Sequence, residues 1–152
     1  MAQSQTVENY LKAIFQAQIA LGQPNELVPM GQLATALRVV PARATTMVKA
    51  LAESGRVHYE PYAGVRLTSA GEKLAALVLR RHRLIELFLV KVMGMSWSEV
   101  HDEAENLEHA VSDRLIDLID EMLGRPEVDP HGDPIPVSNG TLPVQQYDTL
   151  LT

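Results

Sequence analysis

The hydrophobic spacing of residues 6–68 changes once from helical to strand-like, and this change limits the folds open to the chain. Apolar residues recur with a helical period over 6–21, 28–37 and 42–53, and alternate as in strands over 57–60 and 65–68. A tight turn at 39–41 separates the second helical segment from the third, and Pro41 suits the first turn of a helix. This order of elements is typical of a winged helix-turn-helix, in which the hairpin is the wing.

The residues after the hairpin indicate a second, helical region. Helical patterns run from Ser69 to about Val92 and from Ser98 to Met122, with a break at 94–96. The acidic residues of 113–121 alternate with leucine and isoleucine, so we expect them to face solvent. Proline and glycine become frequent from Gly124 onward, which predicts an irregular segment. The chain as a whole is therefore predicted to be mainly α.

Charge is divided unevenly between the two halves. Residues 1–83 carry 10 Lys/Arg and 5 Asp/Glu, whereas residues 84–152 carry 3 and 14, which together give the net charge of -6. A basic half joined to an acidic half indicates that only the first half binds a polyanion. The acidic half could then be solvated surface or a cation site.

Cysteine is absent from the chain, so any metal site must use oxygen and imidazole nitrogen. Such ligands suit manganese, ferrous iron or magnesium better than a structural zinc ion. The N-terminal residues lack the basic and apolar regions of a signal peptide, and no apolar run approaches the ~20 residues of a membrane span. We therefore expect a cytoplasmic location without a membrane partner.

Polar residues gather at the positions that would face DNA in a winged helix. Arg43 could read a guanine edge, and Thr45 or Thr46 could contact a phosphate or a thymine methyl group. Other candidates would hold the DNA backbone from the second helix and from the wing. The predicted DNA-binding residues are Thr35, Arg38, Ala42, Arg43, Thr45, Thr46, Lys49 and Arg66. The alternative is that short polar residues merely cover a surface helix.

Histidines and glutamates share helical faces in the second half of the chain. His82 and Glu86 are four residues apart, which places them on one side of a helix. The next helix carries a stripe at i, i+4, i+7 and i+8 that consists of His101, Glu105, Glu108 and His109. Carboxylates placed together repel each other, and a bound divalent cation would offset that repulsion. The spacing alone fits an acidic, solvated helix face equally well.

Five stretches of sequence, taken together and in this order, point to a known family. They are TVENYLKAIF at 6–15, LTSAG at 67–71, RHRLIE at 81–86, VHDEAENLEHAVSD at 100–113 and DPHGDPIP at 129–136. With these stretches the chain resembles the diphtheria-toxin-repressor family of metal-dependent transcription regulators, which includes iron and manganese sensors. Each stretch alone is unspecific, but the combination covers nearly the whole chain.

The resemblance implies up to two neighbouring metal ions per subunit. The family's first position corresponds to Asn9, Glu105, Glu108 and His109, and its second corresponds to His82, Glu86 and His101. Iron sensors of the family carry Cys and Met where this chain has Glu105 and Asn9, whereas manganese sensors carry Glu and Asp. Glu105 therefore favours Mn(II) over Fe(II). Asn9 departs from both patterns, and the neighbouring Glu8 could take its place.

The resemblance also implies a homodimer that binds double-stranded operator DNA and regulates metal-homeostasis genes. The expected domains are a winged helix-turn-helix DNA-binding domain at 1–70 and a helical dimerisation and metal-binding domain at 71–140. Residues 141–152 are expected to be a tail, or the linker towards an SH3-like domain that many members carry and that is expected to be absent here.

Two alternatives belong to other classes. One is a winged-helix regulator that responds to an organic ligand. The other is a carboxylate-bridged dinuclear enzyme, but the stripe lacks the Glu-x-x-His spacing of four-helix di-iron proteins, so we expect no enzyme.

Overall fold

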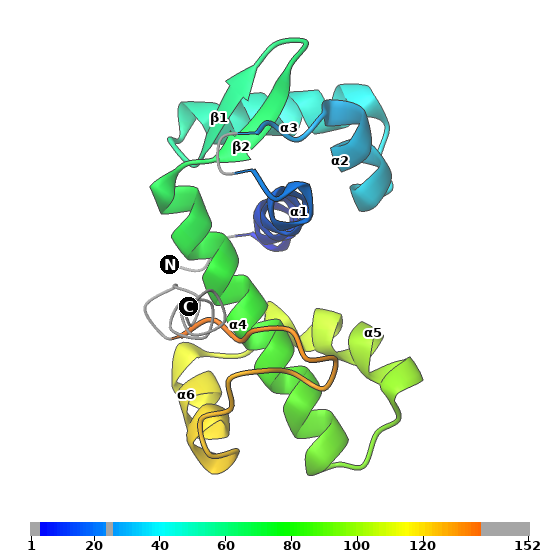
Figure 1. Cartoon of the computed structure of the whole chain (residues 1–152), viewed down its shortest axis with the longest axis vertical. Coiled ribbons are helices and arrows are strands. Elements are labelled where there is room, and N and C mark those ends of the chain that lie inside the picture. Colours follow the sequence, from blue (N-terminus) through cyan, green and yellow to red (C-terminus); the bar gives the residue numbers. More distant parts are fainter. Residues whose placement is uncertain (1–3, 24–25, 138–152) are drawn as a thin grey trace. The chain divides into compact units, whose positions relative to one another are not determined.

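The structure, a computed structural model, describes residues 4–23 and 26–137 (Figure 1). Within this part the elements are α1 (Gln5–Leu21), α2 (Met30–Leu37), α3 (Pro41–Glu53), β1 (Val57–Glu60), β2 (Gly64–Leu67), α4 (Ser69–Lys91), α5 (Trp97–Glu108) and α6 (Asp113–Met122). The chain divides into two compact units between Ala75 and Ala76, inside α4. The prediction of a mainly α chain with one small hairpin is confirmed. The domain bounds 1–70 and 71–140 stay predictions, and residues 141–152 lie outside the described residues.

The first unit is built on a core to which every one of its elements contributes. α1 begins at Gln5 because the Ser4 side chain accepts a hydrogen bond from the Val7 amide, and it ends at Gly22, whose φ of 78° is left-handed. α1 contacts α2 and β2, as Figure 1 shows, and the Leu67 amide donates to Gln18 Oε1 at 2.7 Å. The fully buried core side chains include Leu11, Ile14, Val28, Leu33, Val48 and Val65.

The second helix is shorter than its hydrophobic pattern predicts. Val28 belongs to an antiparallel bridge with Val65, with amide-to-carbonyl distances of 2.7 and 3.0 Å, so the prediction of a helix from residue 28 is wrong. Pro29 is extended, and α2 therefore begins at Met30. Gly64 permits the close approach: a Cβ there would lie 2.3 Å from the Val28 carbonyl oxygen.

The hairpin forms the predicted wing. β1 and β2 are antiparallel, with Val57 opposite Leu67 and Glu60 opposite Gly64. Tyr62 lies in the turn between the strands, is fully exposed, and has a left-handed φ of 66°. Burial therefore cannot explain an aromatic residue at this position.

The second unit has two helices where one was predicted. The prediction of a single helix from Ser98 to Met122 is wrong, because α5 ends at Glu108 and α6 begins at Asp113. Ser112 is the reason: its hydroxyl accepts from the Leu115 amide at 3.1 Å and caps a new helix. The core of this unit consists of Leu84, Ile85, Leu87, Leu89, Val100, Ala104, Ile116, Ile119 and Ile135.

Arg80 changes the interpretation of the acidic face of α6. It is buried, and its guanidinium donates to Asp117 at 2.8 Å and lies 3.5 Å from Asp120. Asp120 is itself only 13% exposed, so the prediction that the acidic residues of 113–121 all face solvent is wrong for this residue. Its charge balances a buried cation instead.

None of the helices in the described part of the chain is both long and apolar enough to cross a membrane.

Candidate functional site

The predicted DNA-binding residues lie on three elements of the first unit. Ala42, Arg43, Thr46 and Lys49 are exposed on α3, and Thr45 is half-buried. Thr35 and Arg38 are exposed at the end of α2, and Arg66 is half-buried on β2. α3 thus presents an unobstructed side with two cations, as a helix that enters a DNA groove must.

Two threonines have their hydroxyl groups engaged within their own helices. Thr35 donates to the Gly31 carbonyl at 2.9 Å, and Thr46 donates to the Ala42 carbonyl at 3.0 Å. A phosphate oxygen accepts hydrogen bonds only, so neither hydroxyl can donate to it while these bonds persist. A methyl contact with thymine is the role that the local geometry leaves open to Thr46.

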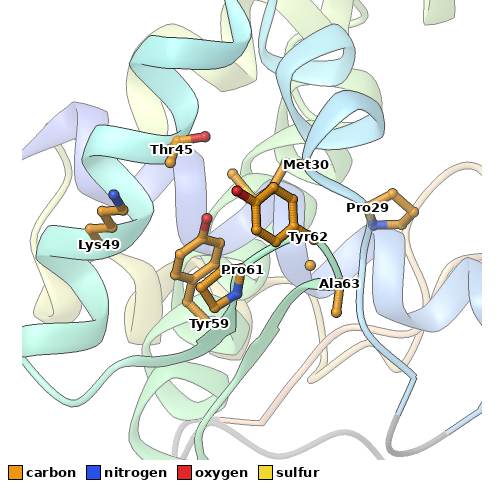
Figure 2. Close-up of a pocket in the computed structure, with 9 residues that line it drawn as sticks. Pro29, Met30, Thr45, Lys49, Tyr59, Pro61, Tyr62 and Ala63 are labelled. Atoms are coloured by element: carbon orange, nitrogen blue, oxygen red, sulfur yellow. The ribbon is translucent and has the colours of Figure 1, made fainter.

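A hollow of about 410 Å³ lies between α3 and the wing (Figure 2). Thr45 and Lys49 border it from α3, and Tyr59 and Tyr62 border it from the hairpin. Sequence reasoning missed Tyr62. Its signal was an aromatic residue inside the predicted turn Pro61–Gly64, where a small polar residue is usual.

Three of the predicted metal ligands meet in the second unit. His82 and Glu86 come from α4 and His101 comes from α5. His82 Nε2 lies 3.2 Å from His101 Nδ1 and 3.4 Å from Glu86 Oε2, and His101 Nδ1 lies 3.5 Å from Glu86 Oε2. One nitrogen or oxygen from each of these residues therefore points to a common position.

The remaining predicted ligands of α5 adjoin this group. Glu108 is 0% exposed, and its Oε1 lies 3.5 Å from His82 Nδ1 and 3.7 Å from His109 Nε2. Glu105 is exposed and lies 3.2 Å from His101 Nε2. Glu108 thus adjoins histidines from both expected metal positions. Glu8 and Asn9 lie on α1 in the first unit, and their part in this site stays a prediction.

The three ligand atoms fit a divalent cation. Metal–ligand bonds of about 2.1 Å put neighbouring corners of an octahedron about 3 Å apart, close to the distances among these atoms. Glu86 Oε2 is buried and has no hydrogen-bond partner in the described structure. A buried carboxylate oxygen without a donor is costly, and a cation would satisfy it.

The charges of the site shift two pKa values. Burial alone would lower the pKa of His82, but the Glu108 and Glu86 carboxylates outweigh it and raise this pKa to about 9. Burial alone would raise the pKa of Glu86, but the His82 ring outweighs it, so that pKa is lowered. In the metal-free site His82 is therefore a cation at neutral pH, and a metal ion must displace its proton.

These shifts predict a stability that depends on pH without metal. His82 has a folded-state pKa above its ordinary value of 6.5, so its stabilisation is full below pH 6.5 and disappears as pH rises through about 9. The loss should not exceed about 3 kcal/mol. Urea unfolding in EDTA from pH 6 to 10 measures it, and His82→Gln should flatten the curve over this window. An unchanged slope in that variant would contradict the assignment.

Asp129 and His131 lie next to Glu86, and sequence reasoning missed both. One ligand atom from each of these two residues and from Glu86 lies within 4.8 Å of the others. Burial, with the nearby charges of Asp133 and Glu86, raises the pKa of Asp129, against two backbone hydrogen bonds that lower it. The signal was present in DPHGD at 129–133, a carboxylate and an imidazole two residues apart in a turn.

Comparison with known families matches both units in turn. Residues 3–65 match the N-terminal DNA binding domain of the iron dependent repressors. Residues 68–137 match the metal binding and dimerisation domain of the same proteins. The chain belongs to the iron-dependent repressor family of metal-dependent transcriptional regulators. Members of this family are regulators and not enzymes, so the dinuclear-enzyme alternative is set aside.

Individual family members agree with this assignment. An uncharacterized HTH-type transcriptional regulator of Methanocaldococcus jannaschii is 36% identical over 76% of this chain and 90% of its own length. The regulator MntR of Lysinibacillus sphaericus is 36% identical over 65% of this chain and 73% of its own. A solved manganese-dependent transcriptional repressor in complex with manganese is 46% identical, with a TM-score of 0.80 over 90% of this chain. This chain spans 61% of that solved chain.

Proposed function

We propose that two copies of this chain bind double-stranded operator DNA when Mn²⁺ occupies sites formed around α4 and α5, and thereby regulate metal-homeostasis genes. The observation that carries the proposal is the trio of His82, Glu86 and His101, whose ligand atoms lie 3.2 to 3.5 Å apart around a buried carboxylate. One position comprises this trio. The other comprises Glu105, Glu108 and His109, together with Asn9 or Glu8. A bound cation would supply the positive charge that holds these carboxylates and imidazoles together.

The ligand chemistry supports manganese over iron. Glu105 supplies a hard oxygen ligand, and the absence of cysteine excludes the thiolate that would favour softer metals. The 46% identical solved relative is described as manganese-dependent and contains manganese. Asn9 offers an amide oxygen, a weaker ligand than a carboxylate. The buried Glu8 beside it is the second candidate from α1.

The DNA-binding step follows from the geometry that a dimer must satisfy. Two α3 helices have to enter successive major grooves, about 34 Å apart. Ligands from α1 and from α5 that hold the same ion would restrict the orientation of the DNA-binding unit. The arrangement that fits DNA is then favoured by its higher affinity for metal. Linkage requires that operator DNA tighten metal binding by the same factor.

A direct experiment compares operator affinity with and without metal. Binding sites are first selected from random double-stranded DNA in the presence of Mn²⁺, and affinity is then measured in Mn²⁺ and in EDTA at one salt concentration. We expect a gain of roughly 5- to 150-fold with Mn²⁺. Equal affinity in both buffers would refute metal dependence and favour a regulator that responds to an organic ligand.

The same assay tests the DNA-binding face. Arg43→Ala should weaken operator binding by about 1–3 kcal/mol and relax the preference at one base pair. Lys49→Ala should weaken binding to all sequences alike, because a phosphate contact carries no sequence information. Lys73→Ala, an exposed lysine on α4 that is outside the predicted set, is the control. A loss in the control as large as that of Arg43→Ala would contradict the assigned face.

A further inference from the structure

We infer that Glu86, Asp129 and His131 form a further divalent-cation position, adjacent to that of His82, Glu86 and His101 and sharing Glu86 with it. One ligand atom from each residue lies within 4.8 Å of the others. The inference rests on the proposed function only through the shared Glu86. It adds the segment that follows α6 to the metal-binding elements.

The segment around Asp129 is held in a fixed conformation. Asp129 Oδ1 accepts the amides of His131 at 2.9 Å and Asp133 at 2.8 Å. Val128 bridges to Pro134, and Ile135 is buried in the core of the second unit. Because both backbone hydrogen bonds use Oδ1, Oδ2 remains on the side of the His131 ring, 3.8 Å from its Nδ1. An oxygen and an imidazole nitrogen are thus placed together before any ion binds.

Two buried carboxylates lie close together at this point. The side chains of Glu86 and Asp129 are each only 2% exposed, and Glu86 Oε2 lacks a hydrogen-bond donor within the described part of the chain. Two neighbouring guanidinium groups have other partners: Arg83 donates to the Pro134 carbonyl, and Arg80 pairs with Asp117 and Asp120. Buried charges of like sign need a cation between them.

The ligands divide into two positions because only Glu86 belongs to both groups. A carboxylate has two oxygens and can bridge neighbouring ions, as in two-metal sites with ions about 4 Å apart. Two carboxylates and an imidazole, with places left for water, suit a hard divalent cation such as Mn²⁺ or Fe²⁺. His131 also packs edge-on against Trp97, with ring centroids 4.9 Å apart.

Counting bound Mn²⁺ tests the inference. Equilibrium dialysis with elemental analysis should show one ion fewer per chain for Asp129→Asn with His131→Gln than for the wild type. Asparagine keeps an oxygen for the two backbone hydrogen bonds, so the segment should stay folded. Asp133→Asn is the matched control, since Asp133 is exposed and contributes only its backbone. A double variant that binds as many ions as this control overturns the inference.

A second double variant separates this inference from the proposed function. His82→Gln with His101→Gln should lose the neighbouring ion and leave His131 in place. If these substitutions lower the Mn²⁺ count while Asp129→Asn with His131→Gln does not, the proposed function holds and the additional position is refuted. If the two double variants each lose the same single ion, the five residues hold one ion together, which also refutes it.

Trp97 provides an independent signal, because it is the only tryptophan in the sequence. Paramagnetic Mn²⁺ bound beside His131 should quench its fluorescence. Asp129→Asn alone keeps the ring contact and should remove that part of the quenching. Quenching identical to that of Asp133→Asn would count against an ion at this position.

Discussion

Replacing Glu108 with glutamine is expected to abolish most of the gain in operator affinity that Mn²⁺ provides. Glu108 is 0% exposed, and its Oε1 adjoins both His82 and His109. The substitution keeps the size of the side chain but removes its charge, so both proposed positions lose a ligand or a charge partner. The ratio of affinity in Mn²⁺ to that in EDTA should fall from roughly 5- to 150-fold to near unity.

Glu103→Gln is the control for this prediction. Glu103 lies on the same helix, is exposed, and belongs to neither group of ligands. Its substitution removes the same charge from the chain, so a general electrostatic effect on DNA would appear in both variants. A Glu108→Gln protein that is folded and keeps the full metal response would contradict the site.

Replacing Gly71 with alanine is expected to destabilise the first unit by about 3 kcal/mol. A Cβ at Gly71 would lie 2.0 Å from the Arg56 carbonyl oxygen and 3.2 Å from Leu67 Cδ2. The carbonyl cannot retreat easily, because it accepts the Thr68 amide at 3.0 Å. Urea unfolding of the metal-free protein, followed by circular dichroism, measures the change.

Gly31 offers a matched comparison on α2. It is also helical, but a Cβ there would meet no atom within 4 Å. Gly31→Ala should therefore stabilise the protein by about 0.5–1 kcal/mol, since alanine loses less backbone entropy in a helix. Equal effects of the two substitutions would show that close packing at Gly71 is not what fixes its identity.

Much of the fold could be predicted because its signals are local. The switch from helical to strand-like spacing predicted the hairpin, and Pro41 predicted the start of α3. The failures were local competitions that the hydrophobic period does not show. Ser112 caps a new helix inside a continuous amphipathic pattern, and Val28 pairs with Val65 although its apolar side chain also fits a helix.

The candidate site was predictable only in part, for the same reason. His82 and Glu86 lie four residues apart on one helix, so helical geometry alone places them on one face. Asp120 was predicted to face solvent because nothing near it in sequence indicates Arg80, its partner on α4. Asp129 and His131 were overlooked because they belong to a turn without a period.

The sequence by itself determined the order of the elements, the family and the helical faces that carry histidine and glutamate, since each depends on residues a few positions apart. Only the tertiary structure decided which of these faces meet. The packing of α4 against α5 puts His101 beside Glu86, and the segment after α6 puts Asp129 and His131 beside the same carboxylate. Those encounters depend on how a hydrophobic core closes, and a pattern of period 3.6 holds no information about its partner.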